Sequence, residues 1–125
     1  ETSSRMAEVK EEKNDAQKLL KDGMKYFQLA TNKEDLKKSL TCFDDMIKIN
    51  VENKKRLWQR GLVLYYLDDF AEGAAQFRLD VELNPNDTEE AIWCFLCEIH
   101  TDGKEKALEN WLKVGRDSRE VMRIS

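Results

Sequence analysis

Hydrophobic positions recur along most of this chain at the spacing of α-helices. One apolar stripe runs from Ala16 to Leu29 and a second from Leu36 to Ile49, with a polar break between them. A repeat of about 3.6 residues places such positions on one face of a helix. Similar stripes predict further helices over 54–67, 70–83, 88–99 and 103–114, and another beginning near residue 118. The pattern predicts an all-α fold of about six to seven helices.

Acidic residues mark several of the predicted helix starts. An Asp oxygen accepts a free amide N–H of the first helical turn, and a Glu three residues later lies favourably at the positive end of the helix. This spacing occurs at Asp69/Glu72, Asp87/Glu90, Asp102/Glu105 and Asp117/Glu120. Each pair falls at a break between stripes, so capping and periodicity predict the same boundaries.

The two ends of the chain differ from the part between them. Residues 1–15 are charged, with Met6 and Val9 among their few apolar side chains, and are expected to form a partly helical or frayed extension. Residues 116–125 are expected to begin a C-terminal capping helix. The stretch 16–115 has the size of one domain.

The stripes contain an internal repeat. Gly23 and Phe43 recur as Gly61 and Phe77, which lie 38 and 34 residues further along the chain. A weaker third copy places Trp111 another 34 residues after Phe77. Repeats of this length are typical of stacked helix pairs. The expected repeats cover about 16–52, 53–86 and 87–115.

The middle of the chain resembles the tetratricopeptide repeat (TPR) family. The resemblance rests on residues 57–67, on the following 69–74 with Phe77, and on the closing stretch 83–87. It implies an α-α superhelix of antiparallel helix pairs, in which Gly61 allows a close helix crossing and Pro85 ends the second helix. The chain departs from the family pattern at Val51, Arg60, Gly73 and Asp80.

Composition and charge narrow the range of partners. The chain is 41% hydrophobic and 37% charged, with five glycines and one proline, which suits long amphipathic helices. Its net charge of −4 argues against nucleic acid, because phosphate binding needs a basic face. It has no apolar run of about 18 residues or more, so no membrane partner is expected.

The cellular compartment is weakly constrained by the sequence. A soluble, cytoplasmic protein is the first expectation, because the charged start has no apolar core like that of a secretory signal. The chain begins with Glu1, as a processed product or a fragment would. Residues 57–122 look similar to TPR-like proteins of photosynthetic organisms and bacteria. A plastid, after removal of a targeting segment, is therefore the alternative.

The resemblance also points to a binding surface. In this family the first helices of successive pairs line a concave groove. The stripe over 54–67 would face such a groove and accept a peptide or a partner helix. Two alternatives stay open: another helix covers this face as ordinary core, or the face forms a homodimer. The candidate groove residues are Lys55, Trp58, Leu62, Tyr65 and Tyr66.

The family's known clamp for chaperone C-termini is not reproduced here. That clamp uses Lys, Asn and Arg on three first helices. Gln59 replaces Asn on the middle helix, and Glu89 and Trp93 occupy the third.

The sequence contains few candidate residues for catalysis or metal binding. Cys94 and Cys97 form a C-x-x-C with His100 nearby, which leaves a metal or redox role as a remote alternative. With Cys42 the thiols number three, and their apolar helical setting favours reduced, buried cysteines. One histidine and no Gly-rich phosphate loop predict a protein that is not an enzyme and needs no cofactor.

Overall fold

The computed structural model describes residues 2–86 and 88–111, and all the regular structure in this part of the chain is helical. The predicted all-α fold is therefore confirmed. Residues 104–111 are helical up to the last described position. The preceding elements are α1 (Thr2–Gln28), α2 (Lys33–Ile49), the 3-10 helix η1 (Val51–Arg56), α3 (Trp58–Tyr66), α4 (Phe70–Leu83) and α5 (Thr88–Asp102).

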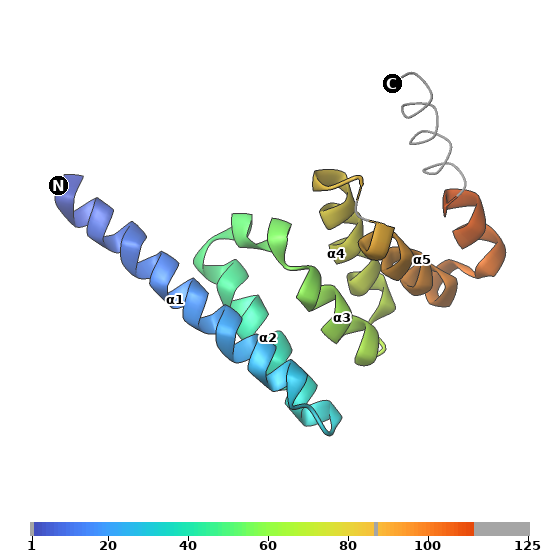
Figure 1. Cartoon of the computed structure of the whole chain (residues 1–125), viewed down its shortest axis with the longest axis horizontal. Helices are drawn as coiled ribbons and strands as arrows, with labels where there is room; N and C mark the ends of the chain where they lie inside the picture. Colours follow the sequence, from blue (N-terminus) through green and yellow to red (C-terminus); the bar gives the residue numbers. More distant parts are fainter. Residues whose placement is uncertain (1, 87, 112–125) are drawn as a thin grey trace, which may run out of the picture.

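Consecutive helices pack side by side (Figure 1). The long helix α1 lies antiparallel to α2, α3 lies antiparallel to α4, and α5 folds back onto α4. The N-terminal half of α1 projects beyond the end of α2 (Figure 1). The short helix η1 connects the first helix pair, α1 and α2, to the second pair, α3 and α4.

The same close contact joins the two helices of both pairs. A Cβ atom placed on Gly61 would lie 2.6 Å from Cζ of Phe77, and one placed on Gly23 would lie 2.7 Å from Cε1 of Phe43. Both phenylalanine side chains are completely buried. The absence of a side chain at each glycine lets the ring of the neighbouring helix approach the backbone. The close crossing expected at Gly61 is present, and Gly23 repeats it.

The third copy of the repeat is packed differently. Phe95 lies 34 residues after Gly61, so an aromatic ring takes the place of the glycine. This ring lies 5.4 Å from that of Trp111, centre to centre. Both rings line a cavity of about 390 Å³ between α4, α5 and residues 104–111. The third copy therefore lacks the glycine–phenylalanine contact of the first two.

Two predicted helices have different boundaries in the structure. The helix expected from residue 16 begins at Thr2 and includes the N-terminal extension, although the side chains of residues 5–15 are all exposed. The helix expected over 54–67 is divided into η1 and α3. Side-chain bonds explain the division: Asn50 accepts the N–H of Glu52, and Asn53 donates to the carbonyl of Met46 at 2.7 Å. Such bonds compete with those of a regular helix.

The acidic capping pairs agree only partly with the structure. Asp69 precedes α4, but only its backbone carbonyl takes part, by accepting the N–H of Gly73. Asp102 is the last residue of α5, and the next helix follows Gly103, whose φ of 90° suits glycine. Asp87 and the pair Asp117/Glu120 lie outside the described residues, as does the expected capping helix over 116–125.

A capping arrangement that the sequence analysis did not identify begins α2. The side chain of Asn32 accepts the N–H of Asp35 at 2.9 Å, and the carboxylate of Asp35 accepts the N–H of Thr31 at 3.1 Å. Two free amide groups at the helix start are thereby satisfied.

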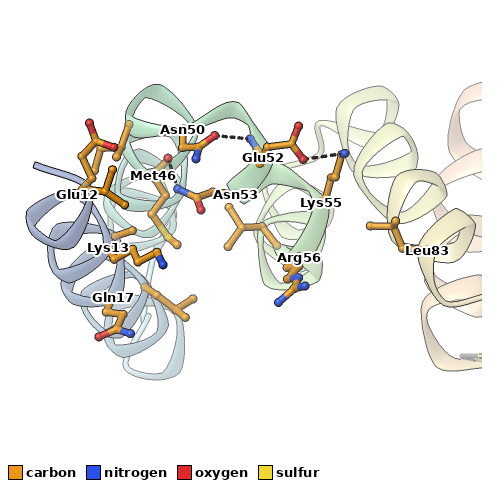
Figure 2. Close-up of a pocket in the computed structure, with 15 residues that line it drawn as sticks. Glu12, Lys13, Gln17, Met46, Asn50, Glu52, Asn53, Lys55, Arg56 and Leu83 are labelled. Atoms are coloured by element: carbon orange, nitrogen blue, oxygen red, sulfur yellow. Dashed lines mark hydrogen bonds and ion pairs between the residues drawn. The ribbon is translucent and has the colours of Figure 1, made fainter. Parts of the chain in front are cut away.

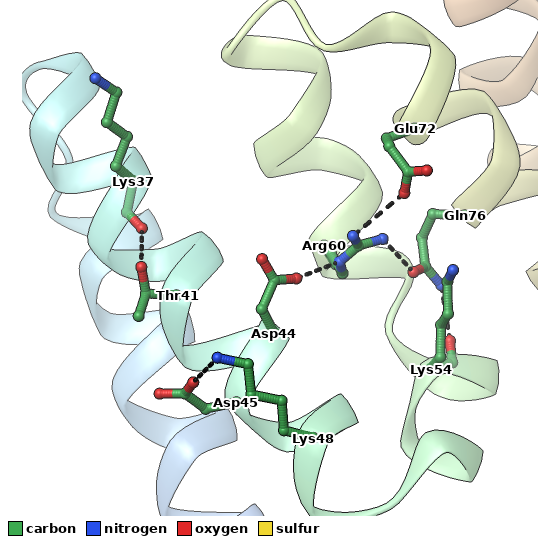
Figure 3. A network of polar contacts seen from close by, with 9 residues as sticks. All are labelled: Lys37, Thr41, Asp44, Asp45, Lys48, Lys54, Arg60, Glu72 and Gln76. Carbon is green, nitrogen blue, oxygen red and sulfur yellow. Dashed lines mark hydrogen bonds and ion pairs between the residues drawn. The ribbon is translucent and has the colours of Figure 1, made fainter.

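A buried polar cluster joins the two helix pairs (Figure 3). The side chain of Arg60 on α3 is 10% exposed and lies between α2 and α4. Its Nε donates to Asp44 at 2.8 Å, its Nη1 to Gln76 at 3.2 Å and its Nη2 to Glu72 at 3.3 Å. The departure from the family pattern at Arg60 therefore has a structural role, because this guanidinium bridges neighbouring pairs.

Candidate functional site

A cavity of about 540 Å³ lies between α1 and η1 (Figure 2). Ala16 and Leu20 of α1 and Leu57, just after η1, give it apolar walls. Leu83, at the end of α4, is 48% exposed and contributes a further apolar edge. The cavity is built from segments that are far apart in sequence and that meet only when the two helix pairs pack.

Charged side chains surround the apolar walls of this cavity. The ammonium group of Lys55 lies 2.7 Å from the carboxylate of Glu52. Lys13 on α1 and Arg56 on η1 lie on opposite sides of the cavity (Figure 2). Neither of these two side chains forms an ion pair with another residue in the described part of the chain. Two basic groups are therefore available at the rim.

The five predicted groove residues are divided between different environments. Lys55 lines the cavity, and Trp58 is 39% exposed at the start of α3. Leu62 is half-buried and packs on the cluster that contains Phe77. Tyr65 and Tyr66 lie at the other end of α3, with ring centres 5.6 Å apart. For Leu62, packing in the core agrees with the alternative that the sequence analysis left open.

Aromatic side chains gather around the two tyrosines. The ring of Tyr65 lies 5.4 Å from Phe70 and 5.2 Å from Trp93, and it is half-buried. The ring of Tyr66 is half exposed and lies 6.1 Å from Phe27 on α1. Tyr65 therefore belongs to the core that holds α5, whereas Tyr66 is available to a ligand.

Phe27 and Trp93 were missed as neighbours of the predicted groove. The repeat could have identified Phe27, because it precedes Tyr65 by the same 38 residues that separate Gly23 from Gly61. The resemblance to TPR repeats placed Trp93 on a groove-lining helix, but its contact with Tyr65 was not predicted, because that contact depends on how α5 folds back over α3 and α4.

The two thiols of the C-x-x-C motif are protonated at neutral pH. Burial, reinforced by the carboxylate of Glu98, raises the pKa of Cys94 to about 12 and that of Cys97 to about 11. The thiol of Cys94 donates to an oxygen of Glu98 at 3.5 Å. His100 stacks on Phe70 with ring centres 3.9 Å apart. Because the thiolate is the form that binds metals and attacks electrophiles, this environment opposes both kinds of chemistry.

The raised thiol pKa predicts a loss of stability at alkaline pH. Above about pH 9, the ordinary thiol pKa, Cys94 ionises in the unfolded chain while the folded thiol stays neutral. The contribution is complete below pH 9 and is lost as the pH rises towards 12. Urea unfolding at pH of about 7 and about 10 should show a smaller loss in Cys94→Ala than in the native chain. Equal losses in the two proteins would contradict this assignment.

Comparisons with known proteins identified no relative of this chain. No protein-family model matches this chain, and no curated protein or solved structure matches it either. Within the described residues, no group of three or more His, Cys, Asp or Glu side chains is placed to hold a metal ion. None of the described helices is both long and apolar enough to cross a membrane.

Proposed function

We propose that this chain is a TPR-like protein–protein interaction module whose cavity between α1 and η1 holds a peptide or a partner helix. The cavity itself carries the proposal, because it joins apolar and basic side chains from α1, η1 and α4 in one concave surface, as ligand-binding pockets do. The matching contacts at Gly23 and Gly61 support the resemblance to TPR helix pairs. Stacking of the pairs into a superhelix is part of the same proposal.

The lining of the cavity favours a ligand with apolar anchors. Leu20, which is partly buried, and the exposed Val9 and Leu83 provide the apolar contact area. An amphipathic helix or an extended peptide would place one or two hydrophobic side chains there. Lys13 and Arg56 at the rim would steer the approach of the ligand and fix its orientation more than they would add to affinity.

The exposed predicted groove residues would extend this surface along α3. Lys55 lies at the cavity, Trp58 follows it, and Tyr66 lies at the far end. Leu62 and Tyr65 would support the surface from the core side. Tyr and Trp side chains bury a large area at little entropic cost, which suits them to a binding face.

A matched pair of substitutions on α1 tests the cavity. Gln17 and Lys18 are both exposed, but only Gln17 lines the cavity. Peptides that bind the native chain are first selected from a random phage-displayed library. Gln17→Trp should fill the cavity and lower the affinity of these peptides by about tenfold or more. Lys18→Trp should leave their affinity unchanged. Fluorescence anisotropy with labelled synthetic peptides measures both, and Tyr66→Ala tests whether the ligands reach the aromatic end of α3.

The outcome decides which surface binds. Peptides that bind Gln17→Trp as tightly as the native chain would exclude the cavity as their site. Equal weakening by both tryptophan variants would indicate a general effect on α1 and would also contradict the proposal. Circular dichroism of each variant establishes that the helices are intact.

A further inference from the structure

The short helix η1 forms one wall of the cavity without a core of its own. None of its six residues, Val51–Arg56, is buried. A 3-10 helix of this length has poor internal hydrogen-bond geometry, so other contacts must fix its position. The side chains of η1 do not supply these contacts by apolar packing, because none of them is buried.

Two side-chain hydrogen bonds hold η1 from opposite sides. On the side of α2, the amide of Asn53 donates to the carbonyl of Met46 at 2.7 Å. On the side of α4, Nε2 of Gln76 donates to the carbonyl of Lys54 at 2.8 Å. The first bond attaches η1 to the first helix pair, and the second attaches it to the second pair.

Arg60 fixes the direction in which the Gln76 amide points. Gln76 is completely buried, and its Oε1 accepts from Nη1 of Arg60. Because arginine only donates, the amide oxygen must face it, so Nε2 faces Lys54. The carboxylate of Asp80, which accepts from Nε2 at 3.3 Å, supports the same orientation. Asp44 on α2 completes the chain of bonds by accepting from Nε of Arg60.

From these contacts we infer that Arg60 and Gln76 are positioning residues that set the width of the cavity between α1 and η1. Neither residue lines the cavity. They act through the backbone of Lys54, which is followed directly by the lining residues Lys55 and Arg56. The biological meaning of this inference rests on the proposed binding function, but its geometry does not.

Distances between spin labels test the inference without a ligand. Nitroxides on keto-bearing amino acids at the exposed positions Lys10 of α1 and Arg56 of η1 report the separation across the cavity by pulsed electron resonance. Gln76→Met removes the bond to Lys54 while keeping a side chain of similar length. We expect the Lys10–Arg56 distribution to broaden, because η1 then keeps its bond to α2 but loses its bond to α4.

A second label pair provides the control. Labels at Lys18 of α1 and Lys38 of α2 lie within the first helix pair, and their distribution should stay unchanged in Gln76→Met. Broadening of both distributions would show a general loosening and overturn the inference. An unchanged Lys10–Arg56 distribution would overturn it as well.

A milder variant keeps the test decisive if Gln76→Met does not fold. Asp44 is 42% exposed, and Asp44→Ala removes the anchor of Arg60 on α2 while both bonds of Gln76 stay in place, although Nε of Arg60 then loses its acceptor. A broadened Lys10–Arg56 distribution in this variant supports the inference, and an unchanged one overturns it. Because the measurement uses no peptide, its failure would leave the outcome of the Gln17→Trp experiment unaffected.

Discussion

Replacing Gly61 with leucine should lower the free energy of unfolding by about 3 kcal/mol. Leucine is the better helix former by roughly 0.8–1 kcal/mol, so the variant would be more stable if the site were open. The structure decides the sign of the effect: a Cβ there would lie 2.6 Å from Cζ of Phe77, so this completely buried ring would have to shift. Urea unfolding followed by circular dichroism measures the effect.

A double variant separates the steric clash from any general effect at Gly61. Phe77→Ala alone should cost about 3–5 kcal/mol because it leaves a cavity. In Gly61→Leu with Phe77→Ala, the leucine occupies part of that cavity. The combined loss should be smaller than the sum of the single losses by about 1–3 kcal/mol. Additive losses would mean that the two residues do not compete for space.

Gly73→Ala provides a graded comparison on α4. A Cβ at Gly73 would lie 3.1 Å from the sulfur of Cys97, a tight contact but longer than the one at Gly61. The gain in helix propensity opposes this contact, so Gly73→Ala should cost much less than Gly61→Leu. A greater loss at Gly73 would contradict the ranking by contact distance.

The elements that the sequence predicted well are those whose signals are local. The predicted bounds of α4, 70–83, agree with the observed Phe70–Leu83, because an apolar stripe continues to Leu83 and Pro85 prevents further helix. The division at η1 was missed because it depends partly on Gln76, a residue more than twenty positions away. The start of α1 at Thr2 was not located within the partly helical extension expected over 1–15, because the side chains of residues 5–15 are all exposed and periodicity detects only helices with an apolar face.

The candidate site was less predictable than the fold for the same reason. Helical spacing placed Lys55 and Tyr66 on one stripe, but the structure puts Lys55 on η1 at the cavity and Tyr66 beside Phe27. The opposite wall, with Lys13 and Gln17, comes from a helix about one repeat earlier in the chain. Which side chains face one another across a cavity depends on tertiary packing, which a single stripe does not encode.

Replacing Arg60 with leucine, the residue that the TPR pattern usually has at this position, should destabilise the chain by about 1–3 kcal/mol. The loss arises at Gln76, whose buried Oε1 would have no donor. The carboxylates of Asp44 and Glu72 are 42% and 50% exposed, so water can solvate them and they add little to the cost. The free energy of unfolding in urea measures the change.

To test the origin of this loss, the side-chain amide of Gln76 is removed in the Arg60→Leu variant. If Gln76 carries the cost, then Arg60→Leu with Gln76→Met should lose less than the sum of the single variants, by about 0.5–3 kcal/mol. Matched substitutions of Asp44 give the control, because Arg60→Leu with Asp44→Ala keeps the buried amide unpaired and should show little such recovery. Recovery with Asp44 but not with Gln76 would place the energetic role of Arg60 in its exposed ion pair instead. Because burying a charged group is itself costly, full recovery would mean that Arg60 contributes to the arrangement of the two helix pairs more than to their stability.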